Sequence, residues 1–151
     1  MSLMEQIYKD VIVERSRRPR HRGVIDPHTH LQEGVNPSCG DELTLSLRVA
    51  GGRVEAAAFE GTGCAISQAS ADLMVEALEG RTVAEAHALT RSFKAMLRGE
   101  EGAGEDLGEL RALEGVRRLH ARVKCATLPW TTLERALADE DESGGRRPGD
   151  A

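Results

Sequence analysis

An alternating run of apolar and polar residues, followed at once by two glycines, sets the strongest constraint on the fold of this chain. Its apolar members are Leu43, Leu45, Leu47 and Val49. A period of two is typical of a half-buried β-strand. Gly51-Gly52 permits the positive φ of a tight turn, so residues 53–61 are predicted to return as the second strand of a hairpin. Because a two-stranded hairpin is marginally stable alone, we expect a third strand, with residues 24–31 (VIDPHTHL) as the best candidate.

Helical periodicity occupies most of the remaining chain. Thr82 and Glu85 have the spacing of a capping box at a helix start, and Pro129 suits the first turn of a final helix. The predicted helical segments are residues 3–15, 65–79, 83–98, 105–113 and 129–138. We therefore predict an α+β fold, a small antiparallel sheet of about three strands with helices packed on one face.

Length and composition favour one soluble domain in a reducing compartment. The 151 residues fit a single domain over 1–138, and the acidic, glycine-rich segment 139–151 is predicted to be a disordered tail. The net charge of -5 argues against a nucleic-acid partner. No apolar run reaches the length of a membrane span, and the first residues do not resemble a secretory signal. Three scattered cysteines do not form a disulfide framework, so we expect a cytoplasmic protein with available thiols.

The three cysteines are each predicted to lie at the edge of an element. Cys39 is in the turn NPSCGD before a strand, Cys64 lies between a strand and a helix, and Cys125 precedes the predicted final helix. These edges can meet at one end of the sheet, and Asp41 is two residues from Cys39 in the same turn. A helix N-terminus at Cys64 and Cys125 would also lower the pKa of their thiols.

Three thiolates and one carboxylate are four ligands, the number that tetrahedral Zn²⁺ takes, although soft thiolates also suit iron–sulfur clusters. The spacing contains no CxxC pair, so simpler interpretations stay open. Cys39 is then a loop thiol, Cys64 and Cys125 are packing residues, and Asp41 is a turn residue.

Other polar residues near these segments have more than one interpretation. His120 is an alternative ligand to the cysteines, and His28 and His30 lie in a predicted loop where they can bind metal or remain at the surface. Arg122 and Lys124 flank Cys125 and can offset the negative charge of the thiolates.

A basic run over residues 15–22 is either a solvated face or a docking surface for an acidic partner.

Three motifs together resemble the U-type iron–sulfur scaffold family. They are NPSCGDELTLSLRV, FEGTGCAISQASADLM and RVKCATLPWTTLERAL, and the resemblance covers about residues 3–138. Two features resemble the SufU branch of that family rather than the IscU branch. Lys124 stands where the IscU branch has a histidine before its third cysteine, and residues 98–121 resemble the extra segment of the SufU branch.

This resemblance implies a function and a set of partners. Cys39, Asp41, Cys64 and Cys125 would bind zinc, and Cys39 would accept persulfide sulfur from a pyridoxal-phosphate cysteine desulfurase of the SufS type. The chain would be a sulfur carrier serving downstream iron–sulfur assembly proteins, rather than a stand-alone enzyme. As a sulfur carrier, it would also serve as a transient iron–sulfur scaffold. Two alternatives remain: a true [2Fe–2S] scaffold that uses the same ligands, and a structural zinc module.

Overall fold

Three antiparallel strands form a sheet in the order β1-β2-β3, with β2 (Asp41–Ala50) in the centre. The computed structural model describes residues 3–100, 103 and 107–140. The apolar side of β2 is buried, as its alternation predicts, through Leu43, Leu45 and Leu47. β3 (Arg53–Thr62) returns through a turn in which Gly51 and Gly52 have φ of 58° and 75°. The predicted hairpin is therefore confirmed.

The third strand was predicted in the wrong segment, because β1 spans His30–Asn36 rather than residues 24–31. Its larger apolar residues point away from the helices: Leu31 and Val35 are 52% and 57% exposed. The covered side instead carries Gly34, where an added Cβ would clash with the hydroxyl oxygen of Thr132. A strand with glycine inside and apolar residues outside does not produce the usual alternation, and the close helix explains why glycine is needed.

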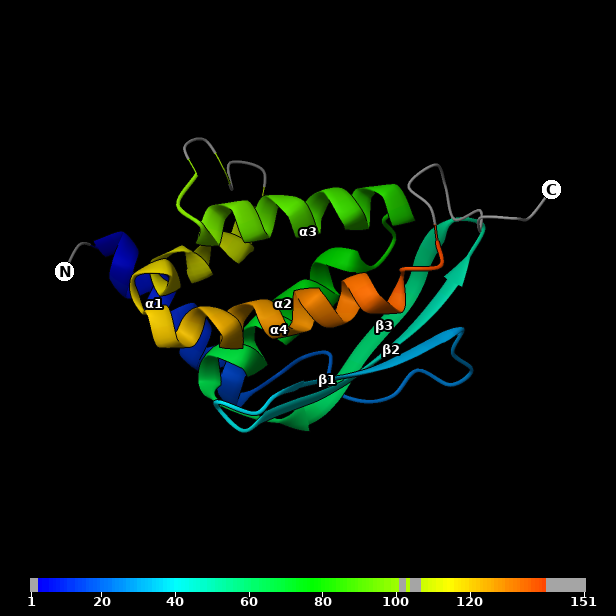
Figure 1. Cartoon of the computed structure of the whole chain (residues 1–151), viewed down its shortest axis with the longest axis horizontal. Helices are drawn as coiled ribbons and strands as arrows, with labels where there is room; N and C mark the ends of the chain where they lie inside the picture. The colour runs from blue at the N-terminus through cyan, green and yellow to red at the C-terminus, as the bar shows by residue number, and fades with distance from the viewer. Residues whose placement is uncertain (1–2, 101–102, 104–106, 141–151) are drawn as a thin grey trace.

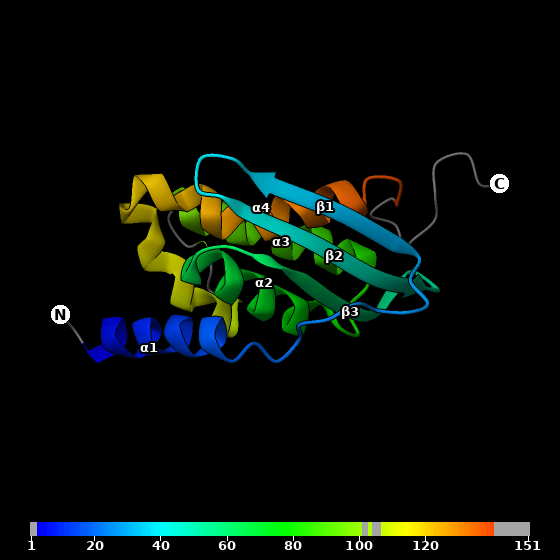
Figure 2. The same cartoon turned by 90° about the horizontal axis from the view of Figure 1, so that it is seen from below.

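The described helices all lie on the same side of this sheet, as predicted for the α+β class, although the first of them lies beyond its end (Figures 1 and 2). They are α1 (Leu3–Arg17), α2 (Ala65–Leu78), α3 (Val83–Leu97), the 3₁₀ helix η1 (Gly108–Arg118) and α4 (His120–Ala136). α2 and α4 lie against the strands, and α3 lies beyond them (Figure 1). Phe93 of α3 stacks on Trp130 of α4 with ring centroids 4.6 Å apart. The capping box of Thr82 and Glu85 is present at the start of α3.

The C-terminal half differs from the prediction in two places. The segment predicted over residues 105–113 is the 3₁₀ helix η1, which begins and ends later. The final helix begins at His120, not at Pro129, and Pro129 lies inside it. An internal proline usually ends a helix, but here Trp130 and Leu133, which follow it, are buried in the core and offset the lost hydrogen bond.

The proposed boundaries of the domain and its tail stay a prediction, since residues 141–151 lie outside the described residues. Among the described helices, none has the length and apolar character needed to cross a membrane.

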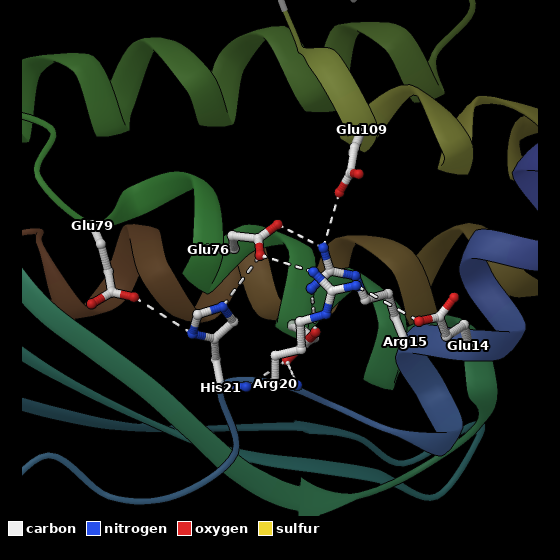
Figure 3. Close-up of polar contacts among 8 residues, drawn as sticks. Glu14, Arg15, Arg20, His21, Glu76, Glu79 and Glu109 are labelled. Atoms are coloured by element: carbon white, nitrogen blue, oxygen red, sulfur yellow. Dashed lines mark hydrogen bonds and ion pairs between the residues drawn. The ribbon is translucent and has the colours of Figure 1, made fainter.

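An ion network centred on the buried Arg15 joins α1 to α2 and η1 (Figure 3). The Arg15 side chain is 3% exposed, and its guanidinium donates to Asp72 at 2.8 Å, Glu76 at 2.6 Å and Glu109 at 2.9 Å. The other oxygen of Asp72 accepts the backbone N–H groups of residues 20 and 21. Contact with Arg15 lowers the pKa of Glu76. The first arginine of the basic run is therefore internal, and only part of that run is free to form a docking surface.

We predict that Arg15→Met lowers the free energy of unfolding by about 3 kcal/mol or more, because it leaves the buried Asp72 carboxylate without its cation. The measurement is urea denaturation followed by circular dichroism. Arg17→Met, an exposed position on the same helix, is the control and should change stability by less than ~0.5 kcal/mol. Equal midpoints for the two variants would contradict the structural importance of this network.

Candidate metal centre

Three separate elements meet at one end of the sheet and bring the predicted site residues there (Figures 1 and 2). Cys39 lies in the turn over residues 37–40 that joins β1 to β2, and Asp41 is the first residue of β2. Cys64 is the N-cap of α2. Cys125 was expected just before the last helix but lies within α4. It still reaches the others, because the first turns of α4 pass over this end of the sheet.

The possible ligand atoms of Cys39, Asp41 and Cys125 all lie within 4.8 Å of one another. Asp41 and Cys125 are fully buried, whereas Cys39 is half-buried. The Cys64 thiol lies outside this group of three but next to it. Its backbone N–H donates to Asp41 Oδ1 at 2.9 Å, and its side chain is one of the neighbours that raise the pKa of the Cys125 thiol. The four predicted residues are therefore neighbours, with three of them in a tight cluster.

The two oxygens of the Asp41 carboxylate have different surroundings. Oδ1 accepts the Cys64 N–H and the hydroxyl of Ser67 at 3.3 Å. Oδ2 is buried and has no hydrogen-bond partner among the described residues. A buried carboxylate oxygen without a partner is costly, and a cation is the usual compensation. Together with the neighbouring thiols, this orphaned oxygen fits a bound metal ion.

Gly63 allows the chain to pass close to this carboxylate. A Cβ added at Gly63 would lie 2.5 Å from Asp41 Oδ1 and 2.6 Å from Ser67 Oγ, both too short for real contacts. The sequence alone did not predict this role for Gly63, and Ser67 was also missed. Ser67 had a detectable signal, because it lies three residues after Cys64 and its N–H donates to the N-cap Cys64 sulfur at 3.5 Å.

Burial is the largest cause that raises the pKa of the Cys125 thiol, followed by the influence of the neighbouring Cys39, Asp41 and Cys64 side chains. The prediction of a lowered pKa at Cys125 is therefore wrong for the ion-free protein, since this residue is not at a helix N-terminus. A divalent cation reverses that preference, because a coordinating thiol is deprotonated. The Cys125 position thus holds a neutral thiol by itself and a thiolate only beside a cation.

The exposed Arg122 adds positive charge to the rim of the cluster. Contact with Cys125, and then the charges of Cys64 and Cys39, raise the pKa of its guanidinium. This supports the predicted role of Arg122. Lys124 and His120 instead line a surface hollow with Gly99 and Arg117.

Comparisons with known proteins agree with this geometry and with the resemblance drawn from the three motifs. The family model of the NifU-like N terminal domain matches residues 7–126. The zinc-dependent sulfurtransferase SufU of Bacillus subtilis is 39% identical over 91% of this chain and 94% of its own length. The iron–sulfur cluster assembly scaffold protein IscU of Thermotoga maritima is 41% identical over 89% and 95%.

A solved structure has the same fold. It is a putative iron–sulfur cluster assembly scaffold protein for the SUF system from Fervidobacterium islandicum, with a TM-score of 0.82 and 39% identity over 88% of this chain and 98% of that one. The chain belongs to the NifU-like N-terminal domain family.

Proposed function

We propose that this protein is a zinc-binding sulfur acceptor of iron–sulfur cluster assembly. The observation that supports it best is the cluster of Cys39, Asp41 and Cys125, in which the buried Asp41 Oδ2 has no partner among the described residues. SufU of Bacillus subtilis is a zinc-dependent sulfurtransferase, and it is similar to this chain over nearly its whole length. We place the protein in the cytoplasm, where its thiols stay reduced.

We assign Cys39, Asp41, Cys64 and Cys125 as the ligands of one Zn²⁺ ion. Three thiolates and a carboxylate form a four-ligand set of the kind that Zn²⁺ prefers. When bound, the ion keeps the thiols deprotonated and protects them from oxidation. The protein orients the Asp41 carboxylate for this role. Ser67 and the Cys64 N–H donate to one of its oxygens, and the other oxygen is left for the ion.

Cys39 is the proposed sulfur acceptor because it is the ligand in a turn and is half-buried, whereas Cys125 is fully buried in a helix. A cysteine desulfurase with pyridoxal phosphate would present a persulfide on its own cysteine. The Cys39 thiolate attacks the outer sulfur, a new S–S bond forms at Cys39, and the desulfurase cysteine leaves as a thiolate. No net oxidation occurs. Arg122, at the rim, is placed to attract the negative persulfide.

The second candidate function is a [2Fe–2S] scaffold that uses the same residues. It is favoured by the three thiols themselves, which suit iron, and by the likeness to the Thermotoga maritima scaffold protein. Lys124 counts against it, because the IscU branch resembled by the motifs has histidine there. The third hypothesis is a purely structural zinc module. Such a protein would unfold when a chelator removes the zinc, and it would not form a persulfide.

We predict that Cys39→Ala abolishes sulfur acceptance, because the proposed nucleophile is removed from the turn. Purified protein is mixed with a cysteine desulfurase and cysteine, and the intact mass is measured for one added sulfur atom. Desulfurase turnover is followed in parallel and should lose its stimulation. Ser38→Ala in the same turn is the control and should behave like the wild type. Persulfide on Cys39→Ala at the wild-type level would rule out the assignment.

We predict that Asp41→Ala lowers the affinity for Zn²⁺ and stabilises any iron–sulfur cluster that is assembled on the protein. The carboxylate is the weakest ligand and the one that exchanges most readily. Zinc affinity is measured by competition with a chromophoric chelator, and cluster lifetime by the decay of its visible absorbance. An unchanged zinc affinity would count against Asp41 as a ligand.

We predict that Gly63→Ala weakens zinc binding by about 10- to 100-fold, the range typical of changes that misorient a ligand. The new methyl group displaces the Asp41 carboxylate without removing any ligand. The same chelator competition applies. Gly115→Ala is the matched control, since an added Cβ there meets nothing within 4 Å. Wild-type affinity in Gly63→Ala would show that the position of Asp41 Oδ1 does not matter.

A further inference from the structure

A second group of possible metal ligands lies at the other end of β1 from the cysteine cluster. His30 is the first residue of β1, and Asp139 and Glu140 follow the end of α4. One ligand atom from each of the three lies within 4.8 Å of the others. In sequence, His30 gave only a weak signal, because the two acidic residues are more than a hundred positions away. Only the fold brings them together.

The spacing of these groups is too long for good hydrogen bonds. His30 Nε2 lies 3.5 Å from Asp139 Oδ1 and 3.5 Å from Glu140 Oε1. An N–H···O bond normally measures about 2.7–3.2 Å. By contrast, two nitrogen or oxygen ligands of a tetrahedral Zn²⁺ ion with bonds of about 2.0–2.1 Å lie roughly 3.4 Å apart. The distances fit the edges of a coordination shell, and they equal the 3.5 Å contacts that His21 makes with Glu76 and Glu79, so an ion is indicated by the surroundings of Glu140 rather than by these distances alone.

The imidazole of His30 is oriented by Thr29. Thr29 Oγ1 accepts the N–H of Val49 at 2.8 Å, donates its proton to the carbonyl of Leu47 at 3.3 Å, and lies 2.7 Å from His30 Nδ1. The direction of that last contact depends on the tautomer of His30, and Thr29 Oγ1 is its acceptor in the tautomer protonated at Nδ1. In that tautomer, Nε2 presents its lone pair toward the Asp139 and Glu140 carboxylates. This is the arrangement of a metal-binding histidine held by a second hydrogen bond.

Glu140 provides an independent indication of a ligand. Its side chain is only 8% exposed, although it carries a carboxylate. Its Oε2 atom is buried and has no hydrogen-bond partner among the described residues. A buried, unpaired carboxylate oxygen is costly, and a cation at this point offsets that cost. The cysteine cluster contains the same feature at Asp41 Oδ2.

We propose that His30, Asp139 and Glu140 form a second site for a divalent cation, with a nitrogen and oxygen ligand set suited to Zn²⁺. Three protein ligands leave the fourth position to water. The ion joins the start of β1 to the C-terminal end of α4, the helix that carries Cys125 at its other end. This second ion therefore stabilises the packing of α4 against the sheet and takes no part in sulfur transfer.

The test is the number of Co²⁺ ions bound by the full chain, measured by equilibrium dialysis and metal analysis. Thiolate ligands give Co²⁺ intense charge-transfer absorbance, whereas a histidine and carboxylate site does not, so the two sites are read separately. We expect two ions per wild-type chain. His30→Ala and Glu140→Gln should each bind one, with the charge-transfer band unchanged. The second ion should raise the melting temperature of the wild type but not of these variants.

His28→Ala is the matched control, an exposed histidine two residues away in the same segment, and it should keep both ions. A wild-type chain that binds a single ion with full charge-transfer absorbance would overturn the second site while leaving the cysteine centre intact. Retention of two ions by both His30→Ala and Glu140→Gln would overturn the ligand assignment. If the wild type loaded with Co²⁺ shows no charge-transfer band, the cysteine centre is refuted instead.

Discussion

The Asp41 carboxylate is the contact on which the cysteine cluster depends. By accepting the Cys64 N–H and the Ser67 hydroxyl, it fixes the start of β2 against the start of α2. The same helix is held further along by Asp72, which receives Arg15 and two backbone N–H groups from the chain that follows α1. Two buried carboxylates thus position α2. Both oxygens of Asp72 have hydrogen-bond partners, whereas Oδ2 of Asp41 has none among the described residues. Asp72 therefore has a structural role, whereas Asp41 is a candidate metal ligand.

The sequence predicts the fold best where one side of an element is apolar and the other polar. The β2–β3 hairpin, the capped α3 and the coverage of a single sheet face follow directly from such patterns. β1 was misplaced because its covered side is occupied by Gly34, whose lack of a side chain admits Thr132. α4 was truncated because local reasoning treats Pro129 as a helix start. In both places tertiary packing overrides the local preference.

The composition of the candidate site was predictable, but its geometry was not. Cys39 and Cys64 lie at element edges as their neighbouring Pro, Ser and Gly residues indicate. Cys125 lies inside a helix, where spacing cannot distinguish a ligand from a core thiol. The supporting role of Ser67, and the approach of Asp139 and Glu140 to His30, depend on contacts between distant segments. Such contacts have no signature in a single sequence.

Pro129 has a mechanical consequence for the third thiol. It has no N–H to give to the carbonyl of Cys125, four residues earlier in the helix. The residues before and after the proline are held by α2 instead, since Ser70 donates to the Ala126 carbonyl and Trp130 donates to Ser70. Ser70 therefore ties this part of α4 to α2 where the helix lacks one of its own hydrogen bonds. The location of the Cys125 sulfur is consequently set by the helix whose N-cap is Cys64, so two of the three thiols share one support.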